Sequence, residues 1–77
     1  MTARALSPAA RAVLRYVRTY HETYGYSPSL RDIVGAGHAS STSMASFYLA
    51  ELEACGLIRR RRGIARGITV VREGGAV

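Results

Sequence analysis

The chain has few residues of the kinds that cross-link a protein or hold a metal. Its 77 residues include one cysteine, Cys55, and two histidines, His21 and His38. A single cysteine excludes a disulfide within the chain and a multi-cysteine zinc site, and we expect it to pack as a small apolar residue. The histidines lie far apart in sequence with no cysteine at ligand spacing. We therefore expect no metal and no other cofactor.

The sequence also lacks a membrane segment and a catalytic motif. Its longest uncharged stretch, residues 33–50, is broken by Gly35, Gly37 and five serine or threonine residues, so it cannot be a transmembrane helix. The N-terminus, MTARALSPAA, has no apolar segment of a secretory signal. Neither histidine adjoins a nucleophile, and the five acidic residues form no evident catalytic pair. We expect no enzyme activity, no membrane and no small-molecule substrate.

Lysine is absent, and the positive charge comes from eleven arginines. Against five acidic residues they give a net charge of +6. Five of them, residues 59–62 and Arg66, lie close together in the segment LIRRRRGIARGITV, residues 57–70. Clustered arginine in a small chain is typical of proteins that bind a polyanion, most often nucleic acid. The alternative from charge alone is a well-solvated basic protein.

Size and composition favour one small folded domain over residues 1–77. Hydrophobic residues make up 48% of the chain, more than disordered sequences carry. The length suffices for a single core. We expect residues 1–5 and 73–77 to be frayed, because the tail REGGAV has little to anchor it.

The first predicted helix covers residues 8–24. Ser7 and Pro8 supply an N-cap and a first-turn proline, and Gly25 is suited to ending the helix. Apolar residues at helical spacing form its buried stripe. They are Ala10, Val13, Leu14 and Val17, extending toward Tyr20 and Tyr24.

Two further helices are predicted over about residues 30–36 and 41–55. Ser29 and Asp32 resemble a capping box before the shorter helix, while Gly35 and Gly37 limit its length. The longer helix has Ser40 or Ser41 as its cap and Gly56 at its end. The residues expected to face the core from both helices are Leu30, Ile33, Val34, Ala45, Tyr48, Leu49 and Leu52.

A β-hairpin is predicted after the third helix, with strands at about 57–62 and 67–71. The second strand is rich in β-branched residues, and the RGIARG segment between the strands holds two glycines suited to a turn. Three helices followed by a hairpin make a mainly α fold with a small β-element, the winged helix-turn-helix.

With its elements in this order, the sequence resembles the DNA-binding domain of LexA-type repressors over about residues 5–72. Three segments carry the resemblance: GYSPSLRDI, SSTSMASFYLAELEACGLIRR and RGIARGITV. The resemblance implies a sequence-specific transcriptional regulator, a small LexA-like or phage-type repressor from a bacterium or a phage. It also implies that the third helix enters the major groove of double-stranded DNA, with the arginine-rich wing on the backbone and minor groove.

The sequence departs from the family pattern in two places. His38 stands where the family usually has a glycine in the turn, so we expect the turn to begin early and to shorten the second helix. LexA proteins continue into a self-cleaving peptidase domain that also dimerises, whereas this chain ends first and is expected to be a stand-alone domain. Neither self-cleavage nor that dimer interface is carried over.

The resemblance assigns base contacts to the exposed face of the third helix. Hydroxyl groups there can bond to base edges and phosphates, and apolar side chains can meet thymine methyl groups. None of the residues is an arginine, asparagine or glutamine with bidentate base contacts, so we expect modest direct readout. Partial core packing for Phe47 and Met44, and capping for the serines, are the alternatives. The assigned residues are Ser41, Thr42, Ser43, Met44, Ser46 and Phe47.

The resemblance and the charge pattern assign backbone and wing contacts to a second group. Arginine neutralises phosphate or enters a narrow minor groove, and glycine allows the main chain to approach closely. A solvated charge run that supports solubility is the alternative. The residues are Arg31, Arg60, Arg62, Gly63 and Arg66. One small module buries limited surface on DNA, so we expect a homodimer on DNA or a protein partner.

Two other functions fit the same residues. A winged helix can act as a protein-interaction module that binds RNA polymerase or another regulator, and the uncommitted composition of the third helix leaves this open. The arginines would also suit an RNA-binding or architectural protein. The arginine-rich wing favours nucleic acid, and the expected location is the cytoplasm, at the nucleoid.

Overall fold

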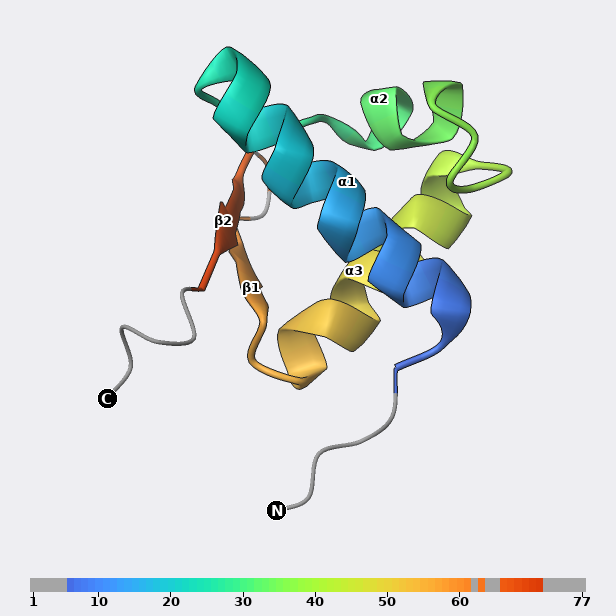
Figure 1. Cartoon of the computed structure of the whole chain (residues 1–77). Coiled ribbons are helices and arrows are strands. Elements are labelled where there is room, and N and C mark those ends of the chain that lie inside the picture. Colours follow the sequence, from blue (N-terminus) through green and yellow to red (C-terminus); the bar gives the residue numbers. More distant parts are fainter. Residues whose placement is uncertain (1–5, 62, 64–65, 72–77) are drawn as a thin grey trace.

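A computed structural model describes residues 6–61, 63 and 66–71 (Figure 1). Its elements follow the order α1 (Pro8–Tyr24), α2 (Leu30–Gly35), α3 (Thr42–Ala54), β1 (Ile58–Arg60) and β2 (Ile68–Val70). The predicted winged helix-turn-helix is confirmed, with β1 and β2 forming a two-stranded antiparallel sheet. The ends expected to be frayed, residues 1–5 and 73–77, lie outside the described residues.

Helix α1 has the predicted bounds and caps. The Ser7 hydroxyl accepts a hydrogen bond from the Ala10 amide at 3.2 Å, and the Gly25 amide donates to the His21 carbonyl at 2.8 Å. The predicted stripe is buried only as far as Val17. Tyr24 is 57% exposed, because the last turns of α1 extend past α3 (Figure 1). Its inclusion in the core stripe was wrong.

Helix α2 starts with a complete capping box. The Ser29 hydroxyl accepts from the Asp32 amide at 3.1 Å, and the Asp32 carboxylate accepts from the Ser29 amide at 3.0 Å. The helix ends at Gly35, one residue earlier than the prediction, and the His38 amide then bonds to the Ile33 carbonyl at 3.1 Å. The early turn expected from the glycines is confirmed.

Helix α3 begins after Ser41, whose hydroxyl accepts from the Met44 amide at 3.1 Å. This selects Ser41 over Ser40 as the cap. The far end of α3 is tied to the start of α1, because the Ser7 amide and hydroxyl both donate to the Glu51 carboxylate, at 3.1 and 3.3 Å. Helix α1 crosses α3 in Figure 1, and the two share one buried face.

The hairpin pairs β1 with β2 so that Ile58 lies opposite Val70. Each strand has three residues, fewer than predicted. Backbone bonds continue the pairing at both ends, from the Val71 amide to the Leu57 carbonyl at 2.9 Å and from the Arg61 amide to the Gly67 carbonyl at 2.8 Å. We call β1, β2 and the segment between them the wing.

The core draws apolar side chains from every helix and from both strands. Because Ile58 and Ile68 are buried in it, the arginine-rich segment is part of the folded structure. Within the described part of the chain, no helix combines the length and the hydropathy needed to cross a bilayer. The buried apolar residues are Ala10, Val13, Leu14, Val17, Ile33, Ala45, Leu49, Leu52, Ile58 and Ile68.

Candidate nucleic-acid interface

The N-terminal half of α3 presents its outer face to solvent, while Ala45 and Leu49 on the inner face are buried. Phe47 is 61% exposed, and its ring makes an edge contact with Tyr48 at 5.9 Å between centroids. Phe47 is neither in the core nor among the half-buried residues packed against it, so the partial core packing weighed as its alternative is wrong. Of the residues predicted to contact bases, Ser41, Thr42, Ser43 and Phe47 are exposed, and Met44 and Ser46 are half-buried.

Ser41 also caps α3, so both roles considered for it remain open. Its oxygen accepts one backbone hydrogen bond. A hydroxyl has a proton to donate in addition to its lone pairs. The side chain can therefore cap the helix and still donate to a phosphate or a base. Contact with bases remains a prediction for this residue and for the other five.

The wing is joined to α3 by Arg60. Its guanidinium Nη1 donates to the Ser46 hydroxyl at 3.1 Å. A predicted backbone-contacting residue and a predicted base-contacting residue are thus brought together from two elements. An arginine side chain has several N–H donors on a planar fork. One bond to Ser46 leaves others to bind an anion beside α3.

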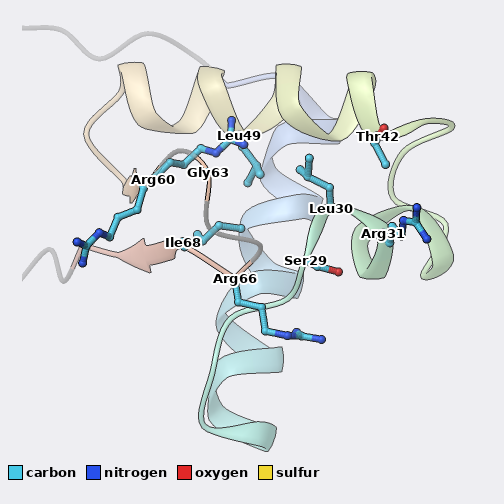
Figure 2. A pocket seen from close by; sticks show the side chains of 11 residues that line it. Ser29, Leu30, Arg31, Thr42, Leu49, Arg60, Gly63, Arg66 and Ile68 are labelled. Atoms are coloured by element: carbon cyan, nitrogen blue, oxygen red, sulfur yellow. The ribbon is translucent and has the colours of Figure 1, made fainter.

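An open groove of about 740 Å³ lies between α2, α3 and the wing. Apolar residues from the three elements, Leu30, Leu49 and Ile68, line part of it (Figure 2). The other lining residues include four arginines, Arg31, Arg60, Arg61 and Arg66. A concave surface lined by charges of one sign raises the local concentration of the opposite charge, so this groove suits a polyanion.

Arg66 is engaged within the molecule. Its Nη1 lies 2.9 Å from Oδ2 of Asp32, 2.9 Å from the Ser27 carbonyl oxygen and 3.1 Å from the Tyr20 hydroxyl. The guanidinium also lies 4.8 Å from the centroid of the Tyr26 ring. The predicted contact of Arg66 with the DNA backbone stays a prediction, but it has an intramolecular competitor that sequence reasoning missed.

This cluster keeps Asp32 charged. The backbone N–H of Ser29, together with hydrogen bonds from Tyr20 and Arg66, holds the pKa of the Asp32 carboxyl below its usual range. Partial burial raises the pKa of the Tyr20 hydroxyl, which therefore keeps its proton. The hydrogen bond with Tyr20, followed by that with Asp32, raises the pKa of Arg66. Arg66 and Asp32 are an ion pair at neutral pH.

The remaining predicted residues lie around the groove or outside the described part. Arg31 is exposed on α2. Gly63 has a backbone φ of 81°, and a Cβ atom there would meet no neighbouring atom. Its backbone conformation therefore favours glycine independently of any close approach to DNA. Arg62 lies outside the described residues.

Within the described part of the chain, neither histidine belongs to a cluster that could hold a metal ion. The His38 ring packs against Tyr16, with 4.9 Å between ring centroids, and Cys55 is a half-buried free thiol. Across residues 6–61, 63 and 66–71, no three His, Cys, Asp or Glu side chains lie close enough together to hold a metal ion. The functional groups found at the interface, among the described residues, are hydroxyls, aromatic rings and guanidinium groups.

Comparison with known proteins identifies the group to which this interface belongs. The family model of the LexA DNA binding domain matches residues 3–67. The chain belongs to this family. It is 42% identical to the LexA repressor of Geobacter metallireducens over 69 residues, which are 90% of this chain and 34% of that protein.

Other LexA repressors match to a similar degree. The protein of Moorella thermoacetica is 41% identical over 86% of this chain and 32% of its own length. That of Bacillus velezensis is 40% identical over 88% of this chain and 33% of its own length. The chain thus spans about a third of the length of these LexA repressors. The resemblance to the LexA family found in the sequence is confirmed.

Proposed function

We propose that the chain is a sequence-specific repressor that binds double-stranded DNA, with α3 in the major groove and the wing on the backbone and adjacent minor groove. The observation that carries the proposal is the exposed N-terminal half of α3 beside the arginine-lined groove. Membership of the LexA DNA-binding domain family supports it, as do relatives that are named LexA repressors.

Base reading falls to the outer face of α3. The major groove of B-DNA is wide enough to admit an α-helix. Thr42 and Ser43 are exposed near the start of α3, where recognition helices approach base edges. Their hydroxyls can donate or accept, while the Phe47 ring can meet a thymine methyl group. We infer that specificity depends on this small set of contacts and on DNA shape.

Backbone affinity falls to the arginines of the groove. Arg31 on α2 and Arg60 and Arg61 in the wing line the groove beside α3. Each phosphate neutralised by such a residue releases condensed cations, which lowers log K by about 0.9 per tenfold rise in salt. We infer that these three residues supply sequence-independent affinity and hold α3 against the duplex.

A second copy of the chain, or a partner protein, completes the binding unit. One module of this size buries limited surface on DNA and binds weakly at physiological salt. Two copies on neighbouring half-sites combine their affinities, and the spacing of the half-sites then follows the geometry of the dimer. We infer a homodimer on DNA as the simplest such unit.

Selection from a random duplex library at fixed salt tests the proposal. We expect enrichment of one motif, repeated at fixed spacing if two copies bind together. The salt dependence should then be measured for Arg31→Ala, which we expect to lower the slope by about one phosphate contact. Arg18→Ala is the matched control, because Arg18 lies on α1 and does not line the groove. Enrichment of no motif would overturn the specific-repressor proposal.

A protein-interaction module is the second candidate. The observation that favours it is a pair of exposed aromatic side chains, Tyr24 and Tyr26, which are 57% and 49% exposed and have ring centroids 6.1 Å apart. Exposed apolar surface often marks a site of protein contact. Binding of RNA polymerase or another regulator, with no motif enriched from the duplex library, would favour this function over DNA recognition.

A further inference from the structure

Resting on the proposed function, we propose that Arg66 is a positioning residue: it fixes the wing against the start of α2 so that the wing meets the minor groove, and it is not itself a phosphate ligand. We call Arg66 and its three polar partners, Tyr20, Ser27 and Asp32, the Arg66 clasp. The two halves of the central ion pair lie 34 residues apart in sequence.

The clasp holds Arg66 by its side chain and by its main chain. Nη1 lies within 3.1 Å of acceptors on Asp32, Ser27 and Tyr20. In the opposite direction, the Ser27 hydroxyl donates to the Arg66 carbonyl at 2.8 Å, and Ser27 is 3% exposed. With both ends held, neither the guanidinium nor the backbone of Arg66 can shift without losing bonds to the segment before α2.

The carboxylate in the clasp is itself fixed. Oδ2 of Asp32 accepts from the Ser29 amide at 3.0 Å and from the Tyr20 hydroxyl at 3.1 Å, in addition to Arg66. The same side chain closes the capping box of α2. Asp32 therefore cannot follow Arg66 if the arginine turns away. The ion pair has one geometry, set by α1 and α2.

The position of Arg66 in the chain transmits this geometry to the wing. Gly67 follows directly, and its carbonyl accepts from the Arg61 amide across the hairpin at 2.8 Å. Ile68 comes next and is 9% exposed, at the start of β2. Fixing Arg66 thus fixes where β2 starts and where Arg61, a groove-lining arginine, lies opposite it.

The same contacts argue against Arg66 as a phosphate ligand. A turn toward DNA would leave the negative charge of Asp32 unpaired beside the groove, where it would repel a phosphate. In the clasp, Arg66 and Asp32 form a neutral pair. The positive charge of the groove is then that of Arg31, Arg60 and Arg61. Nη1 of Arg66 meets its three acceptors while the guanidinium lies over the Tyr26 ring, 4.8 Å from its centroid. Lysine has no planar group that can do both at once, so the clasp needs arginine, whereas a phosphate ligand needs only positive charge.

The sign of the Asp32→Asn effect separates the two roles. Asparagine keeps an oxygen that can accept from the Ser29 amide, and it removes the charge that holds Arg66. If Arg66 positions the wing, Asp32→Asn should weaken binding to the selected duplex by about tenfold, within the range for residues coupled in one network. The same loss is expected for Arg66→Ala, Arg66→Lys and the Asp32→Asn/Arg66→Ala double variant, which should be no weaker than Arg66→Ala alone.

Two controls separate positioning from simple loss of stability. Ser29→Ala removes the other half of the capping box and leaves the Arg66 contacts in place, so it should destabilise the protein and keep its affinity. Footprints give the second readout, measured where melting curves show every variant folded. Clasp variants should lose wing protection from hydroxyl-radical cleavage in the minor groove and keep α3 protection from guanine N7 methylation in the major groove.

Tighter binding by Asp32→Asn, or full affinity with Arg66→Lys, would overturn the inference and make Arg66 a phosphate ligand. If Ser29→Ala lost as much affinity as the clasp variants, the clasp would contribute only to stability and would not position the wing. If the unchanged protein protects no duplex in either groove, the proposed function fails first and this inference fails with it. The two failures are therefore distinguishable.

Discussion

Nη1 of Arg60 lies 3.1 Å from the hydroxyl oxygen of Ser46, and this hydrogen bond joins the wing to α3. The serine oxygen accepts from the arginine, so its proton remains free to donate. Ser46 is half-buried and Ser43, one turn earlier, is exposed. The two serines therefore have different surroundings, although both were predicted from the sequence to contact bases.

Alanine substitution should separate the roles of the two serines. We expect Ser43→Ala to change preference at one base pair, at a cost of about 1 kcal/mol for the preferred base, without changing affinity for unrelated duplexes. Ser46→Ala should weaken binding to every duplex, because it also releases Arg60 from α3. Competition titrations against single-base-pair variants and an unrelated duplex measure both effects. If Ser46→Ala alters base preference alone, the bond to Arg60 has no part in binding.

Phe47→Ala should affect DNA binding far more than stability. Because the ring is 61% exposed, we expect the free energy of unfolding to change by no more than about 0.5 kcal/mol. Leu52→Ala in the core is the contrast, with a cost of about 2–5 kcal/mol. Thermal melts measure both. Duplexes with uracil in place of thymine then test the methyl contact.

Loss of one methyl group should cost the unchanged protein about 0.8 kcal/mol of binding free energy and should cost Phe47→Ala nothing further. An equal loss for both proteins would assign the methyl contact to another residue, with Met44 the nearest apolar candidate on α3.

Asp32 should make stability dependent on acid pH. Its pKa is lowered in the folded state, chiefly by the Ser29 N–H, so between the folded pKa and the unfolded value of about 3.9 the unfolded state binds more protons. The stabilisation is fully present above about pH 5, declines as the pH falls past the unfolded value, and is lost as it falls through the folded pKa. The melting temperature of the unchanged protein should fall more steeply with decreasing pH across this range than that of Asp32→Asn. An equal dependence of melting temperature on pH in the two proteins would contradict the attribution of this effect to Asp32.

Two glycines with open surroundings should respond to alanine in opposite directions. Gly35 closes α2 with an ordinary helical backbone, so Gly35→Ala should stabilise the protein by about 0.4–1 kcal/mol. Gly63 has a φ of 81°, and Gly63→Ala should destabilise it by about 1–2 kcal/mol. Chemical denaturation measures both. Stabilisation by Gly63→Ala would show that the wing adopts another backbone conformation in solution, and destabilisation by Gly35→Ala would contradict the open surroundings of that residue.

The fold could be predicted because its signals are local. Ser7, Ser29 and Ser41 each mark a helix start within three residues of the amide they cap, and the caps held even where Asp32 replaced the longer glutamate of a standard capping box. The helical spacing of apolar residues also predicted most of the core residues. It failed at Tyr24, because periodicity shows which side of a helix is apolar and does not show how far a neighbouring helix reaches along it.

The site was less predictable because its key contacts are not local. The sequence places five arginines close together, and nothing in their spacing shows which of them turns inward. Arg60 meets a residue 14 positions away and Arg66 one 34 positions away. The capping pattern at Ser29 and Asp32 marked a fixed carboxylate, which was the one available signal. Its partner could be found only in three dimensions.

Oδ2 of Asp32 is a meeting point for three parts of the chain: Tyr20 of α1, the amide before α2, and Arg66. This acceptor site exists only after α1 and α2 have packed together, so Arg66 has no complete set of acceptors earlier. We therefore expect the clasp to close late in folding. Interactions made after the transition state slow unfolding and leave the folding rate unchanged. The clasp would thus act as a latch on the native state, extending its lifetime without helping the chain to reach it.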